Sequence, residues 1–187
     1  MKIIHIIPAT FNYFDDIKRS AFGIVEKLTD YGIESQVITL QYGTTTKREK
    51  QEITGPSGPA PAYKYQGLQS IQQALATLSE YDIIHFHCPF LGAAGKIIHW
   101  KKEHPQVPLV VTYYREVRLV DFLSVFISLY NTYYLPKIFQ LAKVITCFSE
   151  AKFGFRSINH QKAVNLSIEQ PQEFVNEDGE HLTENVY

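Results

Sequence analysis

The sequence has few cysteines and no long apolar segment. Its 187 residues include two cysteines, Cys88 and Cys147, which are too few for a disulfide framework and fit reduced thiols inside a cytosolic protein. No stretch reaches the roughly 18 apolar residues that a membrane-spanning helix needs. The N-terminal apolar run, which His5 interrupts, is too short for a signal peptide. We therefore expect a cytoplasmic protein without a spanning helix.

An excess of charge of one sign is also lacking. Eighteen Lys and Arg residues stand against nineteen Asp and Glu residues, which leaves a formal net charge of −1. No overall basic field draws the chain to nucleic acid, so we expect no nucleic-acid partner. Apolar residues make up 45% of the chain and aromatic residues 13%, which is enough for a sizeable core. At this length the chain is expected to form one domain.

Several catalytic and phosphate-binding motifs are absent. The first apolar run is not followed by the glycine fingerprint that brings a helix N-terminus close to a dinucleotide pyrophosphate. The chain has no GxxxxGK[ST] loop, no GxSxG elbow and no CxxC pair. These absences argue against a nicotinamide or flavin domain, a P-loop nucleotidase and nucleophilic catalysis.

Short β-branched runs alternate with segments of helical period, which predicts an α/β fold with a doubly wound, Rossmann-like parallel sheet. Strands are expected at residues 3–7, 35–40, 63–65, 82–87, 108–113, 144–148 and 162–167. Helices are expected at residues 15–31, 69–79 and 92–103, with one or two more over 119–141 and a break before Pro136. The domain then spans residues 1–168, with a mobile Gly/Pro/Thr-rich loop at 43–62 and an acidic tail or truncated interdomain linker at 169–187.

Ligands of open parallel sheets bind beyond the carboxyl ends of the strands, so the residues there are the candidates for a site. The candidates that line this cleft are Thr10, Phe11, Asp15, Asp16, His87, Tyr113, Tyr114, Arg115, Ser149 and Glu150. None of them is singled out as catalytic.

Two histidines lie on one expected strand, and we expect them to point to opposite faces of the sheet. On that expectation His85 and His87 cannot hold a metal together, and no metal site is expected. We interpret His85 as a hydrogen-bonded interior residue. His87, nearer the strand end, is the better functional candidate.

Five segments in order carry a resemblance to a known family: KIIHIIP at 2–8, DYGIESQV at 30–37, YDIIHFHCP at 81–89, PLVVT at 108–112 and AKVITCFSE at 142–150. From Met1 to about Phe174, the chain resembles the N-terminal domain of GT-B glycosyltransferases of family 4. The resemblance implies one half of a GT-B fold, which binds the acceptor, while a second Rossmann domain holds most of the nucleotide-sugar. Transfer in the cleft between the halves retains the configuration at the sugar.

This resemblance also sets expectations for activity and partners. The chain is expected to bind no cofactor tightly and no metal, to use a nucleotide-sugar donor only with a second domain or chain, and to be inactive alone. Two departures from the family leave a second interpretation open. Asp15 and Asp16 stand where the family has a Gly-Gly pair that meets the donor diphosphate, and Tyr113 follows Thr112 where the family tends to have His. The two Asp residues also suit an ordinary helix start.

The second interpretation is a non-catalytic pseudo-glycosyltransferase subunit that binds a partner or a glycan. A third is an unrelated α/β binding module of flavodoxin-like topology.

Residues 113–143 are unusually aromatic, with eight Phe and Tyr side chains and a narrow polar stripe at helical spacing. Core packing is one explanation. The others are a homodimer interface through residues 119–143 and a weak peripheral contact with an anionic membrane at its inner face. Seven basic residues against three acidic ones between residues 96 and 143 suit the membrane contact.

Overall fold

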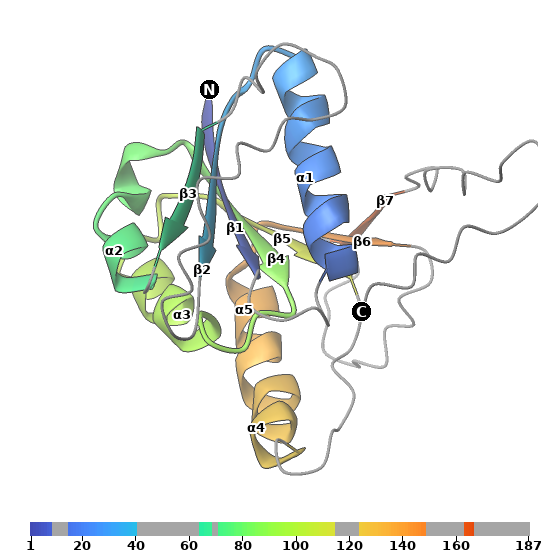
Figure 1. Cartoon of the computed structure of the whole chain (residues 1–187). Coiled ribbons are helices and arrows are strands. Elements are labelled where there is room, and N and C mark those ends of the chain that lie inside the picture. The colour runs from blue at the N-terminus through green and yellow to red at the C-terminus, as the bar shows by residue number, and fades with distance from the viewer. Residues whose placement is uncertain (9–14, 41–63, 69–70, 115–123, 149–162, 167–187) are drawn as a thin grey trace, which may run out of the picture.

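The computed structural model describes residues 1–8, 15–40, 64–68, 71–114, 124–148 and 163–166 (Figure 1). Seven strands form one sheet in the order β3-β2-β1-β4-β5-β6-β7, and every neighbouring pair is parallel. The strands are β1 (Lys2–Pro8), β2 (Glu34–Leu40), β3 (Lys64–Leu68), β4 (Ile83–Cys88), β5 (Leu109–Tyr113), β6 (Val144–Phe148) and β7 (Ala163–Leu166). The predicted α/β fold with a parallel sheet is confirmed.

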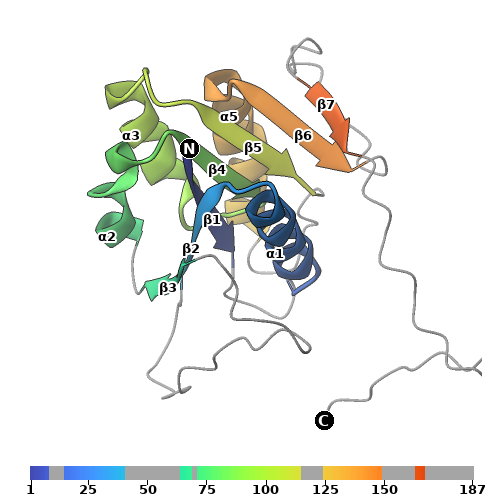
Figure 2. The ribbon, with the colours of Figure 1, turned by 90° about the horizontal axis from the view of Figure 1, so that it is seen from above.

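The helical elements connect these strands. They are α1 (Asp15–Asp30), α2 (Ile71–Leu75), the 3₁₀ turn η2 (Leu78–Glu80), α3 (Ala94–Glu103), α4 (Ser124–Leu129), the π-helical segment η4 (Tyr130–Tyr134) and α5 (Leu135–Leu141). Figure 2 shows α1 on one side of the sheet, with α2, α3 and α5 on the other. Among the described residues, no helix has the length and apolarity needed to cross a membrane.

Alternation along the central strands builds a core on each face. Ile4, Ile6, Ile84 and Phe86 point to the face that α2, α3 and α5 cover, and this core is the larger of the two. On the other face, a small cluster joins Ile7 of β1 and Val37 of β2 to Ala21 and Val25 of α1. The central strands β1, β4 and β5 are buried on both faces, which explains why their sequences are nearly continuous apolar runs.

The sequence of helix α1 explains which of its faces packs on the sheet and where the helix ends. Ile17, Ala21 and Val25 recur every four residues and are all buried, so they form the stripe that packs on the sheet. Gly32 has φ of 73°, and its N–H bonds to the carbonyl of Thr29 while the N–H of Ile33 bonds to that of Leu28. This is a Schellman ending, for which glycine carries little strain.

The predicted break before Pro136 is wrong. Leu135 is helical, with φ of −62° and ψ of −46°, and the helical path continues from α4 through η4 into α5. Pro136 has no N–H to donate, and its ring would crowd the carbonyl one turn earlier. The chain accommodates it with a wider turn, in which the N–H of Leu135 reaches back five residues to Tyr130.

Other expected boundaries differ by a few residues. The helix expected at 69–79 is shorter, since α2 ends at Leu75 and the 3₁₀ turn η2 follows. The strand expected at 63–65 is β3, which continues to Leu68. The loop expected at 43–62 and the tail expected at 169–187 lie outside the described residues.

Candidate functional site

The strand order reverses between β1 and β4, which places the carboxyl ends of β1, β4 and β5 at the topological switch point. The N–H of Tyr114, just after β5, bonds to the carbonyl of Cys88 at the end of β4 (3.1 Å). A hydrogen bond also fixes the turn after β4, because the buried N–H of Phe90 donates to the hydroxyl of Tyr130 (3.0 Å). The ends of β4 and β5 are thus held together at the edge where a ligand is expected.

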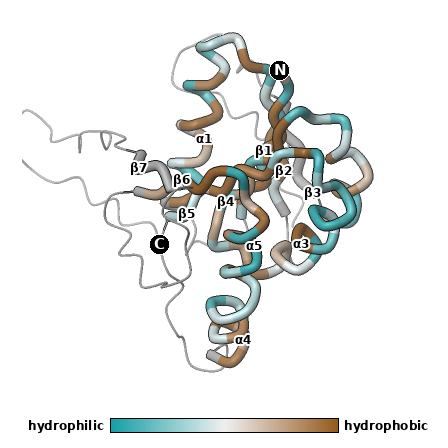
Figure 3. Tube along the Cα trace, turned by 180° about the vertical axis from the view of Figure 1, so that it is seen from behind, coloured by the Kyte–Doolittle hydropathy of each residue, from teal (hydrophilic) through white to brown (hydrophobic). Residues whose placement is uncertain are grey.

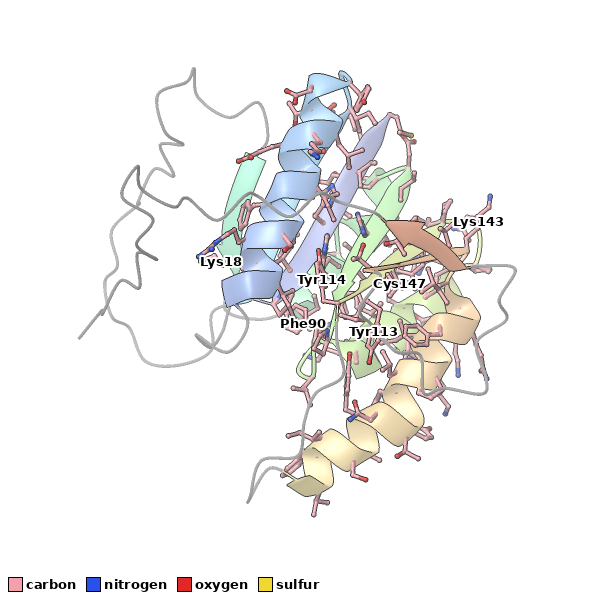
Figure 4. The ribbon with its side chains drawn as sticks, turned by 90° about the vertical axis from the view of Figure 1, so that its right-hand side faces the viewer. Lys18, Phe90, Tyr113, Tyr114, Lys143 and Cys147 are labelled. Atoms are coloured by element: carbon pink, nitrogen blue, oxygen red, sulfur yellow. The ribbon has the colours of Figure 1, made fainter. Side chains whose placement is uncertain are left out.

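Consecutive residues Tyr113 and Tyr114, labelled in Figure 4, have different environments. Tyr113 is 2% exposed and meets Phe139 of α5 edge-on, with ring centroids 5.6 Å apart. It was expected to line the cleft, but the structure places it in the core, because its position in β5 faces α5. Tyr114 lies on the other face and is partly exposed. Burial of its hydroxyl raises the pKa of Tyr114 well above 10, so it stays protonated and is no base at neutral pH.

Three histidines of β1 and β4 gather on the same face as Tyr114. The rings of His85 and His87 stack with centroids 4.2 Å apart, and the ring of His5 lies 4.9 Å from His85 and 5.6 Å from His87. The expectation that His85 and His87 point to opposite faces is therefore wrong. Side chains alternate along a strand with a period of two, so residues two apart share a face.

Register brings the third histidine to this pair. His5 and His85 are directly opposite each other in the pairing of β1 with β4. All three side chains are buried. We call His5, His85 and His87 the histidine cluster. The sequence analysis missed His5, although a histidine in each of two apolar strands, KIIHIIP and DIIHFHC, was a visible signal.

Hydroxyl groups fix one end of the cluster. The hydroxyl of Thr146 donates to the carbonyl of Val111 (3.4 Å) and lies 2.7 Å from the hydroxyl of Thr112, which lies 2.7 Å from Nε2 of His85. If Thr146 donates to Val111, it accepts from Thr112, and Thr112 then accepts from His85. With this direction of bonding the proton of His85 is on Nε2 and the lone pair on Nδ1, whereas donation from Thr146 through Thr112 to the ring would place the proton on Nδ1.

The other end of the cluster reaches Tyr114. Nδ1 of His87 lies 2.8 Å from the hydroxyl of Tyr114, and Nε2 of His87 lies 3.3 Å from Nδ1 of His5. Nε2 of His5 is buried and has no hydrogen-bond partner among the described residues. His87 thus connects His5 to the partly exposed Tyr114.

Burial keeps the histidine cluster uncharged at neutral pH. It lowers the pKa of His85 to about 4. It also lowers the pKa of His5 and of His87 well below 6.5, and the neighbouring imidazoles lower both further. Neutral imidazoles can accept or donate hydrogen bonds and can ligate a metal, but they supply no positive charge for a diphosphate.

For the remaining candidate site residues, the structure gives either the backbone position alone or no description. Asp15 and Asp16 form the start of α1, where negative charge is favourable to the helix dipole. Thr10, Phe11, Arg115, Ser149 and Glu150 lie outside the described residues. Cys88 is buried, and burial raises the pKa of its thiol to about 12, which agrees with the argument against nucleophilic catalysis.

The aromatic segment is partly core and partly surface. Tyr130 and Phe139 are buried, whereas Val125, Phe126, Leu129 and Tyr133 are exposed, Phe126 by 66%. We call these four exposed residues the α4 apolar face. Figure 3 shows hydrophobic colour at the far end of α4 as well as along the central strands. Lys137 places its ammonium 3.4 Å from the ring centroid of Tyr133, so a positive charge borders this face.

Comparisons with known proteins agree with this architecture. The family model described as Glycosyltransferase Family 4 matches residues 17–151. Among solved structures, the chain is similar to an alpha-glucosyltransferase in complex with UDP and a 13-mer DNA containing a central A:G mismatch, with a TM-score of 0.52 and 13% identity. The match covers 87% of this chain and 40% of that one.

A second structure is an alpha-glucosyltransferase in complex with UDP, at a TM-score of 0.49 and 13% identity over 78% of this chain and 35% of that one. At 13% identity, the likeness to the first structure concerns the fold alone. The chain spans well under half the length of these glucosyltransferases. A search of curated proteins finds no match. Since the family model covers most of the sequence, this chain belongs to Glycosyltransferase Family 4.

Proposed function

We propose that the chain is the acceptor-binding N-terminal half of a retaining, nucleotide-sugar-dependent glycosyltransferase, and that transfer requires a second, donor-binding domain or chain. The observation that carries the proposal is the family match over residues 17–151. The parallel sheet with its switch point between β1 and β4 supports it. The chain spans 40% of the length of the glucosyltransferase whose fold it shares.

The chemistry of the carboxyl edge suits a hydroxyl-rich acceptor. Tyr114 is partly exposed, and its hydroxyl is held 2.8 Å from Nδ1 of His87. A phenol hydroxyl can both donate and accept hydrogen bonds, and the ring offers an apolar surface to a sugar. Tyr114 is therefore the acceptor-contacting residue in this proposal, and His87 orients it.

The same edge is poorly suited to the donor. α1 begins with Asp15 and Asp16, and the histidine cluster is neutral. Each carboxylate near a phosphate costs about 1 kcal/mol at roughly 4 Å even in bulk water. Lys18 and Arg19 follow the two Asp residues in α1, so the described part of this edge carries balanced charge and no excess of cations for a diphosphate. A second, donor-binding domain or chain is therefore part of the proposal.

The alternative is a non-catalytic pseudo-glycosyltransferase subunit that binds a partner or a glycan. Two observations favour it. Asp15 and Asp16 occupy the helix start where the resemblance expects a Gly-Gly pair, and Tyr113, after Thr112, is in the core and cannot replace the expected histidine. The two proposals differ in one respect, which is whether any complex of the chain transfers sugar.

Binding measurements test the acceptor role. We expect saturation-transfer NMR to detect binding of an oligosaccharide from a panel of hexose-containing glycans, and we expect calorimetry to show no micromolar binding of UDP-, GDP- or ADP-sugars. Tyr114→Phe removes only the hydroxyl and should weaken glycan binding. Tyr31→Phe is the matched control, because Tyr31 is 84% exposed and follows α1 at the opposite end of that helix. Equal loss in both variants would contradict the site.

Turnover separates the two proposals. The chain should transfer no labelled sugar alone and should do so when co-expressed with a second Rossmann half, for which a neighbouring reading frame is the first candidate. Transfer by the purified chain alone would refute the half-site proposal. A glycan-binding complex that never transfers sugar would instead establish the pseudo-glycosyltransferase.

A further inference from the structure

The three uncharged imidazoles of the histidine cluster lie close together on one face of the sheet, on β1 and β4. Each of the three residues offers a ring nitrogen, and these ligand atoms all lie within 4.8 Å of one another. We propose that His5, His85 and His87 form a binding site for one Zn²⁺ ion at the switch point between β1 and β4. This site shares His87 and its partner Tyr114 with the proposed acceptor site, but zinc binding does not depend on sugar transfer.

The separation of two of the nitrogens fits a shared metal as well as it fits a hydrogen bond. Nδ1 of His5 and Nε2 of His87 are 3.3 Å apart, slightly beyond the usual 2.7–3.2 Å range for N–H donors. Two tetrahedral ligands with Zn–N bonds of about 2.0–2.1 Å lie about 3.3–3.4 Å apart. For the widest separation, 4.8 Å, the rings must close by about 1.5 Å to reach that ligand spacing. Zinc binding therefore requires rotation of these side chains.

Outer hydrogen bonds already orient two of the ligands. A metal-binding histidine usually donates its other ring N–H to a fixed acceptor, which sets the tautomer and the direction of the free lone pair. Thr112, backed by Thr146, takes this place at Nε2 of His85. The hydroxyl of Tyr114 takes it at Nδ1 of His87. The nitrogens left over, Nδ1 of His85 and Nε2 of His87, are then the ligand atoms.

His5 has a nitrogen that the protein leaves unsatisfied. With one nitrogen facing His87 and the other without a hydrogen-bond partner, every tautomer of this ring leaves one buried polar atom without a good bond. A metal ion bound through Nδ1 of His5 replaces the contact with His87 by a ligand bond from each ring. The proton of His5 is then on Nε2, which has no hydrogen-bond partner among the described residues.

The donor set and its surroundings point to zinc with an open fourth position. Imidazole ligands suit Zn²⁺, and three histidines with a water or hydroxide is an established zinc geometry. The ion would bring two positive charges into a site with neutral ligands. A hydroxide in the fourth position would reduce that charge, and the partly exposed Tyr114 marks the side from which solvent reaches the cluster.

Zinc binding would link distant parts of the sequence. His5 is in β1, and His85 and His87 are in β4, about eighty residues later, with β2 and β3 on the intervening chain. The ion would therefore clamp the central strand pair from which the sheet extends in both directions. Stability of the fold, rather than sugar transfer, is the property that it should change.

Binding of Zn²⁺ to the chelator-treated chain tests this proposal directly. Competition with a chromophoric chelator should give one equivalent of tightly bound Zn²⁺, and thermal unfolding should shift to higher temperature when Zn²⁺ is added. Thr112→Val nearly preserves shape but removes the outer partner of His85, and should weaken binding by about 10–100-fold. His85→Gln should weaken it further. His99→Gln is the control, since His99 is exposed on α3.

A measurement on the unaltered protein guards against variants that fail to fold. Long-range ¹H–¹⁵N spectra should show the ring nitrogens of His5, His85 and His87 shifting on addition of one equivalent of Zn²⁺, with those of His99 and His104 unmoved. Absence of stoichiometric binding by the unaltered chain would overturn the proposal. So would binding that shifts only exposed histidines, or that survives His85→Gln and Thr112→Val undiminished.

Discussion

Metal-free protein, kept in a chelator, should lose stability in mild acid because of its buried imidazoles. In the folded chain, burial holds the pKa of His85 at about 4, whereas an unfolded histidine titrates near 6.5. Between these two values the unfolded state binds more protons than the folded state. The free energy of unfolding must therefore fall as the pH drops from 6.5 towards 4.

The size of this loss is large enough to measure. The full pKa difference of His85 corresponds to about 3 kcal/mol, of which about 2 kcal/mol is already lost at pH 5. His5 and His87 act in the same direction, because their pKa values are also lowered by burial and by their neighbours. A domain of this kind is typically stable by about 5–15 kcal/mol, so the three histidines together govern its acid limit.

Urea unfolding followed by circular dichroism at several pH values between 7.5 and 5 would measure the effect. Above pH 5 most carboxylates remain ionised in both states, so the histidines dominate the slope. His85→Gln removes one titrating group and should flatten the dependence, while His99→Gln, on the exposed face of α3, should keep it. An unfolding free energy that is constant across this range would refute the reasoning. So would a slope that disappears in His99→Gln and persists in His85→Gln.

Two further predictions concern the segment from α4 to α5. Tyr130→Phe should cost about 1–3 kcal/mol of unfolding free energy, because the buried N–H of Phe90 loses its acceptor, whereas Tyr133→Phe, on an exposed ring, should be nearly neutral; equal midpoints in urea for both variants would contradict the role of this hydrogen bond. The α4 apolar face should mediate weak dimerisation that sedimentation detects and that Phe126→Glu abolishes, since a carboxylate would have to be desolvated at the contact. A chain that stays monomeric but binds anionic vesicles in a salt-sensitive way would assign this face to a membrane instead.

The fold was predictable because burial on both faces leaves a strong sequence signal. Val144–Phe148 is a strand with the expected boundaries, and β1, β2, β4 and β5 differ from expectation by one or two residues. Apolar runs that end at glycines and prolines are sufficient to predict where these strands begin and end. The path through Pro136 was not predictable from local preference, because packing of buried residues on both sides, Tyr130 and Ile138, keeps the chain helical against the preference of a residue before proline.

The histidine cluster shows what local reasoning about a site cannot supply. Which strand lies beside β4, and at what register, is a tertiary property, and it is the pairing of His5 with His85 that completes the cluster. The error over His85 and His87 was of a different kind, since the alternation of a strand already places residues two apart on one face. Correct use of that rule would have predicted the pair and left only the third histidine to the structure.

The charge of the carboxyl edge is the strongest physical reason to look for a second donor-binding unit. A nucleotide diphosphate carries concentrated negative charge, and sites that bind it use helix N-termini, arginines or lysines. At the described edge the imidazoles of His85 and His87 are neutral and Tyr114 stays protonated. α1 opens with two acidic residues, whose charge Lys18 and Arg19 balance. These groups suit hydroxyls better than phosphates. A complex that transfers sugar should therefore hold the diphosphate on its other unit, and nucleotide affinity should follow mutations there and ignore Tyr114→Phe.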